Sequence, residues 1–138
     1  MPKLPRELME LVRQRAANRC EYCLHPQAFE TSTFHADHIR PRIAGGPTTP
    51  GNLCLACPPC SLRKSFKRKG RDPRSGLLVR LFHPRRDRWV EHFRLDRSGH
   101  IVGRTAIGRA TIKALDLNDH HRVVIRVELL LMGRIILP

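Results

Sequence analysis

Acidic residues are scarce in this chain, and long apolar runs are missing. The 138 residues include 12 Asp and Glu against 26 Lys and Arg, which gives a formal net charge of +14 at pH 7. A basic excess of this size points to a polyanionic partner, of which nucleic acid is the commonest. An anionic membrane surface is the rival, but no long basic amphipathic helix that would lie flat on lipid is evident. The remaining alternative is a basic surface that serves solubility alone.

No apolar stretch is long enough to span a membrane, because charged side chains interrupt even the most apolar one, residues 123–137. The first residues are charged and do not resemble a signal peptide. Internal repeats and low-complexity segments are missing too. We therefore expect one domain, or a compact module with an appended segment, in a reducing cytosol and not in a membrane.

Four of the five cysteines form two Cys-x-x-Cys pairs, Cys20 with Cys23 and Cys57 with Cys60. In a chain without a secretion signal, this pattern favours a metal over disulfides. Zn²⁺ binds thiolates well, and each pair supplies two adjacent corners of a tetrahedron. The sequence therefore predicts a four-cysteine zinc site, with reduced, metal-free thiols as the alternative.

The fifth cysteine, Cys54, forms an overlapping pair with Cys57. Prolines at positions 58 and 59 make the turn from Cys57 to Cys60 a rigid knuckle, whereas residues 54–57 have the pattern of an extended chain. We therefore expect Cys54 to be a buried apolar thiol, as free cysteine usually is.

Local patterns predict an α+β fold. Apolar residues recur at helical spacing, and strand-like runs lie between turn-forming glycines and prolines. We predict helices over residues 4–18, from 58 to near 70, over 106–117 and over 119–132, and strands over 33–39, 52–56, 77–82, 89–95 and 100–102, with a hairpin turn at 96–99. Around the cysteines the order is strand, loop, strand, helix.

The predicted helices carry apolar stripes that should face the core. These are Leu8, Leu11, Val12 and Ala16 in the first helix, and Val123, Val124, Val127, Leu130 and Leu131 in the last. Thr105 and Asn118 are the expected N-caps of the last two helices, and Gly133 should end the last one. Trp89 and Phe93 are expected to anchor the core instead of stacking on bases.

Asp37 and His38 lie between the two cysteine pairs. A hard divalent ion prefers carboxylate oxygen, and a neighbouring histidine can accept a proton from water near neutral pH. Basic side chains can hold a phosphodiester; the candidates are Arg40, Arg63, Lys64, Lys67, Arg68 and Lys69. Together these features indicate metal-assisted phosphodiester hydrolysis. Alternatively, Asp37 caps a turn and His38 is an ordinary polar residue or a zinc ligand.

A series of motifs over residues 15–66 resembles the zinc-bearing branch of the HNH endonucleases. In order they are Arg19-Cys20-Glu21-Tyr22-Cys23, Phe34-His35-Ala36-Asp37-His38-Ile39-Arg40-Pro41, Gly45-Gly46-Pro47-Thr48-Thr49, Asn52-Leu53-x-Leu55-Ala56-Cys57-x-x-Cys60 and Lys64. Residues 72–111 are also similar to the C-terminal extension of many small HNH proteins.

The resemblance implies a small ββα-metal core, held by the zinc site, within residues 1–75. Residues 76–138 would form a C-terminal extension, with a β-hairpin and helices packed on the core. The implied activity is metal-dependent hydrolysis of DNA, most simply double-stranded, that leaves 5′-phosphate and 3′-hydroxyl ends.

The resemblance also implies residue roles. His38 would be the general base, and Asp37 would bind a divalent ion such as Mg²⁺ that neutralises the leaving oxygen. Asn52 corresponds to the middle asparagine, which orients the histidine through hydrogen bonds to its loop. Lys64 would contact phosphate.

One position departs from the family pattern, because Ser61 stands where Asn or His usually helps to bind the catalytic ion. A serine can bind through a water, leave a more open site, or signal lost activity. His35 lies two residues before Asp37 on a predicted strand, so their side chains share a face. His35 is therefore a candidate replacement ligand; otherwise it faces phosphate or solvent.

Two main hypotheses follow. The first is an active metal-dependent DNA endonuclease, favoured by Asp37, His38 and Asn52. The second is a zinc-containing nucleic-acid-binding module without catalysis, favoured by Ser61. A third is an RNA-binding or ribosome-associated zinc protein, because charge alone does not distinguish RNA from DNA.

Overall fold

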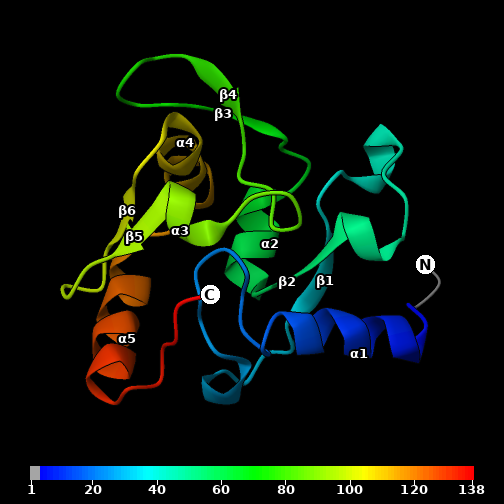
Figure 1. The fold of residues 1–138 in the computed structure, drawn as a ribbon, viewed down its shortest axis with the longest axis horizontal. Helices are drawn as coiled ribbons and strands as arrows, with labels where there is room; N and C mark the ends of the chain where they lie inside the picture. Colours follow the sequence, from blue (N-terminus) through cyan, green and yellow to red (C-terminus); the bar gives the residue numbers. More distant parts are fainter. Residues whose placement is uncertain (1–3) are drawn as a thin grey trace.

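The computed structural model describes residues 4–138, so the first three residues of the expected core segment lie outside it. Helices and three two-stranded antiparallel sheets confirm the α+β class (Figure 1). The elements are α1 (Arg6–Arg15), η1 (Gln27–Phe29), β1 (His35–His38), η2 (Arg42–Ala44), η3 (Pro50–Asn52), β2 (Leu53–Ala56), α2 (Pro58–Lys64), β3 (Lys69–Arg71), β4 (Leu78–Arg80), α3 (Trp89–His92), β5 (Phe93–Leu95), β6 (Ile101–Gly103), α4 (Ala106–Leu115) and α5 (His120–Leu131). Within residues 4–138, no helix combines the length and the apolar character needed to cross a membrane.

Strands β1 and β2 and helix α2 form the strand, loop, strand, helix unit that the sequence predicts. The strands pair in antiparallel register, with Asp37 opposite Cys54 and His38 opposite Leu53. All four residues of β2 are buried, because α1 packs against it. Helix α2 begins directly after Cys57 with two prolines in its first turn, where their missing N–H groups cost no hydrogen bond. The unit therefore places Asp37 and His38 on a strand supported by a buried neighbour.

Helix α2 is shorter than expected. Its C-cap, Ser65, has a φ of 49°, which takes the chain out of the helix. Ser65 and Phe66, which were expected within the helix, lie beyond its end, and the basic run continues as strand β3. Arg71 lies opposite Leu78 and Lys69 opposite Arg80. The predicted strand at 77–82 thus exists, as β4, but its partner β3 was missed because lysine and arginine are weak strand signals.

The predicted strand at 89–95 is half wrong, since its first four residues form the short helix α3 before β5 begins. Trp89 and Phe93 are four residues apart and their ring centroids are 5.1 Å apart. Both side chains are buried, and Trp89 Nε1 donates a hydrogen bond to the Tyr22 carbonyl at 2.9 Å. They are core anchors, as predicted. The turn at 96–99 joins β5 to β6 as expected.

The N-cap of α4 is Thr105, as predicted, and it accepts a hydrogen bond from the Gly108 backbone. The N-cap of α5 is Asp119, one residue later than expected. Asn118 instead bonds both backbone groups of Ile101 at 2.8 Å. The Asn118 side chain thus pairs with the backbone of β6 like a neighbouring strand. It is therefore not available to cap α5.

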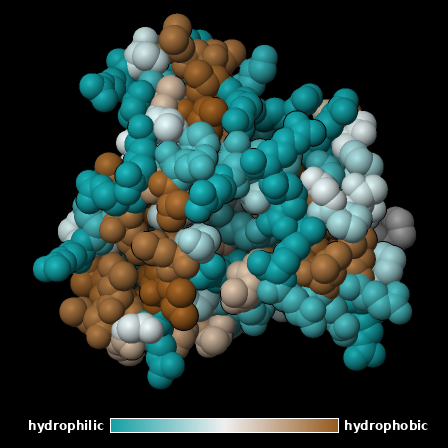
Figure 2. Space-filling model, viewed as in Figure 1, coloured by the Kyte–Doolittle hydropathy of each residue, from teal (hydrophilic) through white to brown (hydrophobic). Residues whose placement is uncertain are grey.

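The predicted apolar stripe of α5 is only partly right, because Val123, Val127 and Leu130 are half-buried. The buried residues of this helix are Arg122, Arg126 and Leu129, whereas Val124 and Leu131 are exposed. Apolar side chains gather on the surface over α5 at the lower left of Figure 2. Arg126 is 1% exposed because its guanidinium donates to the carbonyls of Gly99 and Leu117. These carbonyls need buried donors, which an apolar residue cannot supply.

Helix α1 also deviates from its predicted face. Val12 and Ala16 are buried, but Leu11 is 41% exposed. The helix ends at Arg15, because Ala17 and Asn18 adopt positive φ values. This early end lets the chain turn sharply into Cys20.

A single buried cluster draws residues from both sides of the expected boundary at residue 75, including Tyr22, Phe82 and Phe93. Strands β3 and β4 pair across that boundary. The division into residues 1–75 and 76–138 stays a prediction, but the β3–β4 hairpin joins the two segments.

The β3–β4 hairpin is fixed to α4 by Asp72. This fully buried carboxylate accepts hydrogen bonds from Arg109 Nε at 2.8 Å and Arg109 Nη2 at 3.0 Å. Ser75 Oγ donates to it as well, at 2.6 Å. Arg109 and then Ser75 hold the pKa of Asp72 well below its ordinary value of 3.8.

Replacing Asp72 by Asn should destabilise the protein in a pH-dependent way. Because the pKa of Asp72 is lowered by folding, its contribution is present above the ordinary value of 3.8 and is lost as the pH falls through the lower folded value. The difference in urea midpoint between wild type and Asp72→Asn should therefore be largest at neutral pH and should shrink in strong acid. A difference that stays constant with pH would contradict this role.

Candidate functional site

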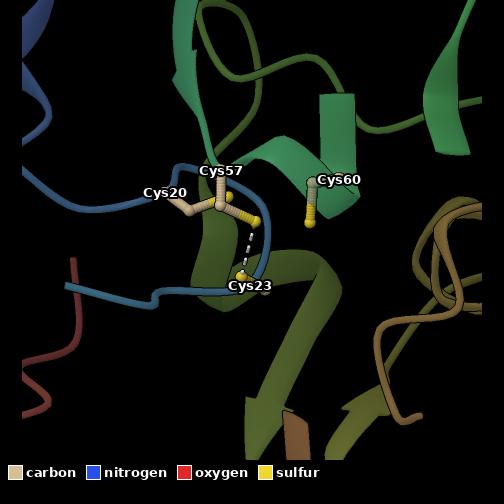
Figure 3. A group of neighbouring side chains, drawn as sticks. All are labelled: Cys20, Cys23, Cys57 and Cys60. Atoms are coloured by element: carbon tan, nitrogen blue, oxygen red, sulfur yellow. Dashed lines mark hydrogen bonds between the residues drawn. The ribbon is translucent and has the colours of Figure 1, made fainter. Parts of the chain in front are cut away.

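Four cysteine thiols lie close together where the turn after α1 meets the start of α2 (Figure 3). Cys20 and Cys23 flank a tight knuckle, whereas Cys57 is the N-cap of α2 and Cys60 lies in its first turn. All four side chains are buried, and their sulfur atoms lie within 4.8 Å of one another. The two pairs that the sequence predicts therefore meet.

The backbone explains why the pairs meet. Leu24 has a φ of 68° and donates to the Cys20 carbonyl, which closes the knuckle. Glu21 then pairs with Leu55 of β2 twice: its N–H donates to the Leu55 carbonyl, and its carboxylate accepts from the Leu55 N–H at 2.7 Å. The knuckle is thereby fixed to the strand that leads into Cys57.

The sulfur arrangement fits a tetrahedral zinc ion. A Zn–S bond of about 2.3 Å implies sulfur atoms about 3.8 Å apart, and Cys23 and Cys57 are separated by 3.7 Å. All cysteines are free thiols, so disulfides do not compete. Burial raises the pKa of Cys20 well above its ordinary value, and a bound cation would offset the cost of several buried thiolates. The four cysteines are positioned to bind a metal ion and can form a zinc site.

Cys54 stays outside this cluster, as the sequence predicts. Its thiol contacts Tyr22 Oη at 3.7 Å, and burial raises its pKa to about 12. Cys54 is therefore a neutral, apolar side chain of β2.

Arg122 of α5 contacts the cysteine cluster, which the sequence did not reveal. Its Nη2 donates to Cys57 Sγ at 3.5 Å, and the residue is only 8% exposed. Burial by itself would lower the pKa of Arg122, but the nearby cysteines, Cys23 first and then Cys57, raise it. A zinc ion with four thiolates carries a net charge of −2, so the guanidinium supplies a compensating charge. Its position, 65 residues after Cys57, left no local signal.

Metal analysis of two cysteine variants tests the site. We expect the wild type and Cys54→Ala to retain one zinc ion per chain, whereas Cys60→Ala should lose tight binding. Structural zinc contributes on the order of 10 kcal/mol to folding, so Cys60→Ala should also unfold at a much lower urea concentration. Loss of zinc from Cys54→Ala together with its retention by Cys60→Ala would overturn the assignment.

Arg122→Met should weaken zinc binding by about 10- to 100-fold, the usual effect of removing a residue that supports a metal ligand. Competition with a chromophoric chelator measures this loss. Arg122→Lys is the matched control, because it retains the charge and should keep most of the affinity. Equal affinity for zinc in the wild type and in Arg122→Met would rule out charge compensation by Arg122.

Asp37, Ser61 and Lys64 meet between β1 and α2. Ser61 Oγ donates to Asp37 Oδ1 at 3.3 Å, and Lys64 Nζ lies 3.0 Å from Asp37 Oδ2. The Lys64 side chain is 3% exposed and also donates to the His38 carbonyl at 3.0 Å. One buried ammonium thus contacts both residues of the Asp37-His38 pair.

The His38 imidazole contacts the loop that follows β1. Its Nε2 lies 2.9 Å from Thr48 Oγ1 and accepts a hydrogen bond from Arg42 Nε at 3.3 Å. Burial, and then the positive charge of Arg42, lowers the pKa of His38. The ring is therefore neutral near pH 7 and able to accept a proton.

Asn52 fixes the loop after His38. Its Oδ1 accepts from the Arg40 N–H at 2.9 Å, and its Nδ2 donates to the carbonyls of Arg40 at 3.0 Å and Pro47 at 2.8 Å. Gly46 allows this close fold, since a Cβ there would lie 1.8 Å from the Arg40 carbonyl oxygen. The asparagine thus holds both ends of the loop that carries Thr48.

The remaining predicted residues separate into three groups. His35 is exposed at the start of β1, and among residues 4–138 only the cysteines form a cluster of three or more His, Cys, Asp or Glu side chains of ligand geometry. Arg63 turns toward α5 and forms an ion pair with Asp119 at 2.7 Å. The others border a hollow of about 1050 Å³, which adjoins Asn52 but does not include Asp37, His38 or Ser61; they are Arg40, Lys64, Lys67, Arg68 and Lys69.

Comparison with known families matches residues 20–67 to a model described as HNH endonuclease. The match begins at the first cysteine of the cluster and ends three residues after α2. Comparisons with curated proteins and with solved structures give no match.

Proposed function

Since residues 20–67 match the HNH endonuclease model, we propose that this protein is a metal-dependent endonuclease that hydrolyses phosphodiester bonds in DNA. The observation that carries this proposal is the pairing on β1 of a carboxylate in contact with α2 and a histidine of lowered pKa. A module that only binds nucleic acid has no need of such a base. The net charge of +14 supports a polyanionic substrate.

In the proposed reaction, His38 removes a proton from the attacking water. Contacts with Thr48 and Arg42 keep the imidazole oriented. Asn52 holds the loop that presents Thr48, so its role is to position the base. The lowered pKa of His38 leaves it unprotonated before the reaction.

Asp37 and Ser61 offer a carboxylate and a hydroxyl oxygen, the ligand types that Mg²⁺ prefers. They fit such an ion with few protein ligands, because Mg²⁺ usually keeps several waters. When bound, the ion would stabilise negative charge on the leaving oxygen. His35 remains a candidate third ligand by its place two residues before Asp37 on β1.

Lys64 is better explained as a positioning residue than as the phosphate contact that the family resemblance implied. Its ammonium is buried between Asp37 and the His38 carbonyl, where it holds the strand against α2. We propose that the four cysteines hold a structural Zn²⁺. Free thiols of this kind suit a reducing cytosol.

The second candidate is a zinc-containing nucleic-acid-binding module without catalysis. The contacts of Asp37 favour it, because both carboxylate oxygens already have a protein neighbour, Ser61 for one and Lys64 for the other. Binding of an ion would have to compete with the Lys64 ammonium. The two candidates share the zinc site and the basic surface, so activity separates them.

A plasmid-nicking assay with Mg²⁺ or Mn²⁺ tests the endonuclease. His38→Ala should lower the cleavage rate by at least about 100-fold, the usual contribution of a general base. Asp37→Ala should lower it as well, because it removes the carboxylate proposed to bind the ion. His121→Ala is the matched control, since His121 is an exposed histidine on α5 and should cleave like the wild type. A chelator should abolish cleavage. Equal cleavage by the wild type and His38→Ala would refute the catalytic assignment of His38, whereas no cleavage by the wild type would leave the non-catalytic module as the function.

A further inference from the structure

We propose that the hollow of about 1050 Å³ beside Asn52 is a groove that binds the phosphodiester backbone of duplex DNA next to the cleaved bond. This basic groove is lined by residues of the loop after β1 between positions 39 and 52, of the segment 64–69 and of the segment 80–86. The inference rests on the proposed function and extends it, because it assigns DNA binding to a segment outside the HNH match.

The groove has two walls of different origin. One wall belongs to the matched HNH residues and includes Arg40, Asn52 and Lys67. The other comes from residues 68–86, which follow the match, and includes Lys69 and Arg86. The surface between the β3–β4 hairpin and the loop after β1 is mostly hydrophilic in Figure 2. The HNH match alone therefore supplies only half of the groove.

Positive charge dominates the lining, and no aspartate or glutamate belongs to it. Two of its cations are already paired, Lys64 with Asp37 and Arg80 with Asp87. The others are exposed and have no carboxylate partner among residues 4–138; they are Arg40, Lys67, Arg68, Lys69 and Arg86. Exposed cations spread along a groove suit a repeating anion better than one small ion.

The groove adjoins the proposed catalytic strand. Ile39 and Arg40 line it and follow His38 directly in the chain. Asn52 also lines it and bonds both backbone groups of Arg40. A nucleic-acid strand lying in the groove would therefore reach the end of β1, beside the His38 loop.

The second wall is fixed before DNA binds. Asp72 ties the β3–β4 hairpin to Arg109 of α4. The Phe82 N–H donates to Thr111 Oγ1 at 2.9 Å, which ties the chain after β4 to the same helix. Gly70 packs closely against α4, where an added Cβ would lie 3.3 Å from the Ala110 carbonyl oxygen, closer than ordinary van der Waals contact. A preformed wall binds without the cost of ordering a loop.

Charge removal on the second wall tests the inference. The groove variant combines Arg68→Gln, Lys69→Gln and Arg86→Gln, all outside the HNH match. The control variant combines Arg13→Gln, Arg94→Gln and Arg97→Gln, which remove the same charge from exposed positions that do not line the groove. Both are made in full-length His38→Ala protein, and binding to a fluorescent DNA duplex is measured by anisotropy over a range of salt concentrations.

The groove variant should bind DNA at least about tenfold more weakly, and its slope of log affinity against log salt should shrink by about 2 to 3, one unit per lost phosphate contact. The control should change affinity by less than about threefold. Equal losses in the two variants, an unchanged groove variant, or a loss confined to duplex RNA would each overturn the inference. Such a result would leave the proposed nuclease untouched if the wild type still cleaves plasmid DNA and His38→Ala does not. Conversely, weaker binding by the groove variant together with no plasmid cleavage by the wild type would support the groove and refute the nuclease.

Discussion

The rest of the structure depends on one buried cluster of four cysteine side chains. Four thiols within 4.8 Å join the knuckle after α1, the end of β2 and the start of α2. As thiolates they would repel one another, and a metal ion together with the cation of Arg122 would offset that repulsion. Because Cys60 and Lys64 lie one turn apart on α2, the same helix that closes the cluster also brings Lys64 to Asp37.

Much of the structure of residues 20–67 was predictable because its sequence signals are local. Cysteine spacing, two prolines at the start of α2 and short apolar strands predict the unit that the structure contains. The predictions that failed concern contacts between residues that are far apart in the sequence. Arg122 and Arg126 are buried because distant sulfur atoms and carbonyls need donors, and no pattern within α5 reveals those partners. Strand β3 was missed since its pairing with β4, not its composition, makes it a strand.

In the candidate site, too, local features were predictable and contacts between distant residues were not. The choice of Asp37, His38 and Asn52 rested on adjacent residues and motif order, and the structure brings Asp37 together with Ser61 as expected from that order. The sequence could not reveal that Lys64 would be buried against Asp37 or that Arg63 would pair with Asp119. Basic residues look alike in a sequence, and only their neighbours distinguish a structural ion pair from a free surface charge.

The contact between Arg122 and Cys57 has a consequence for the newly made chain. Ribosomes must add another 65 residues after Cys57 before this arginine exists. Until then, the cysteine cluster lacks its compensating cation and the cover of α5. The nascent protein therefore completes the surroundings of its cysteine cluster late, and a chain cut short before α5 would lack the Arg122 contact even though residues 20–67 were already present.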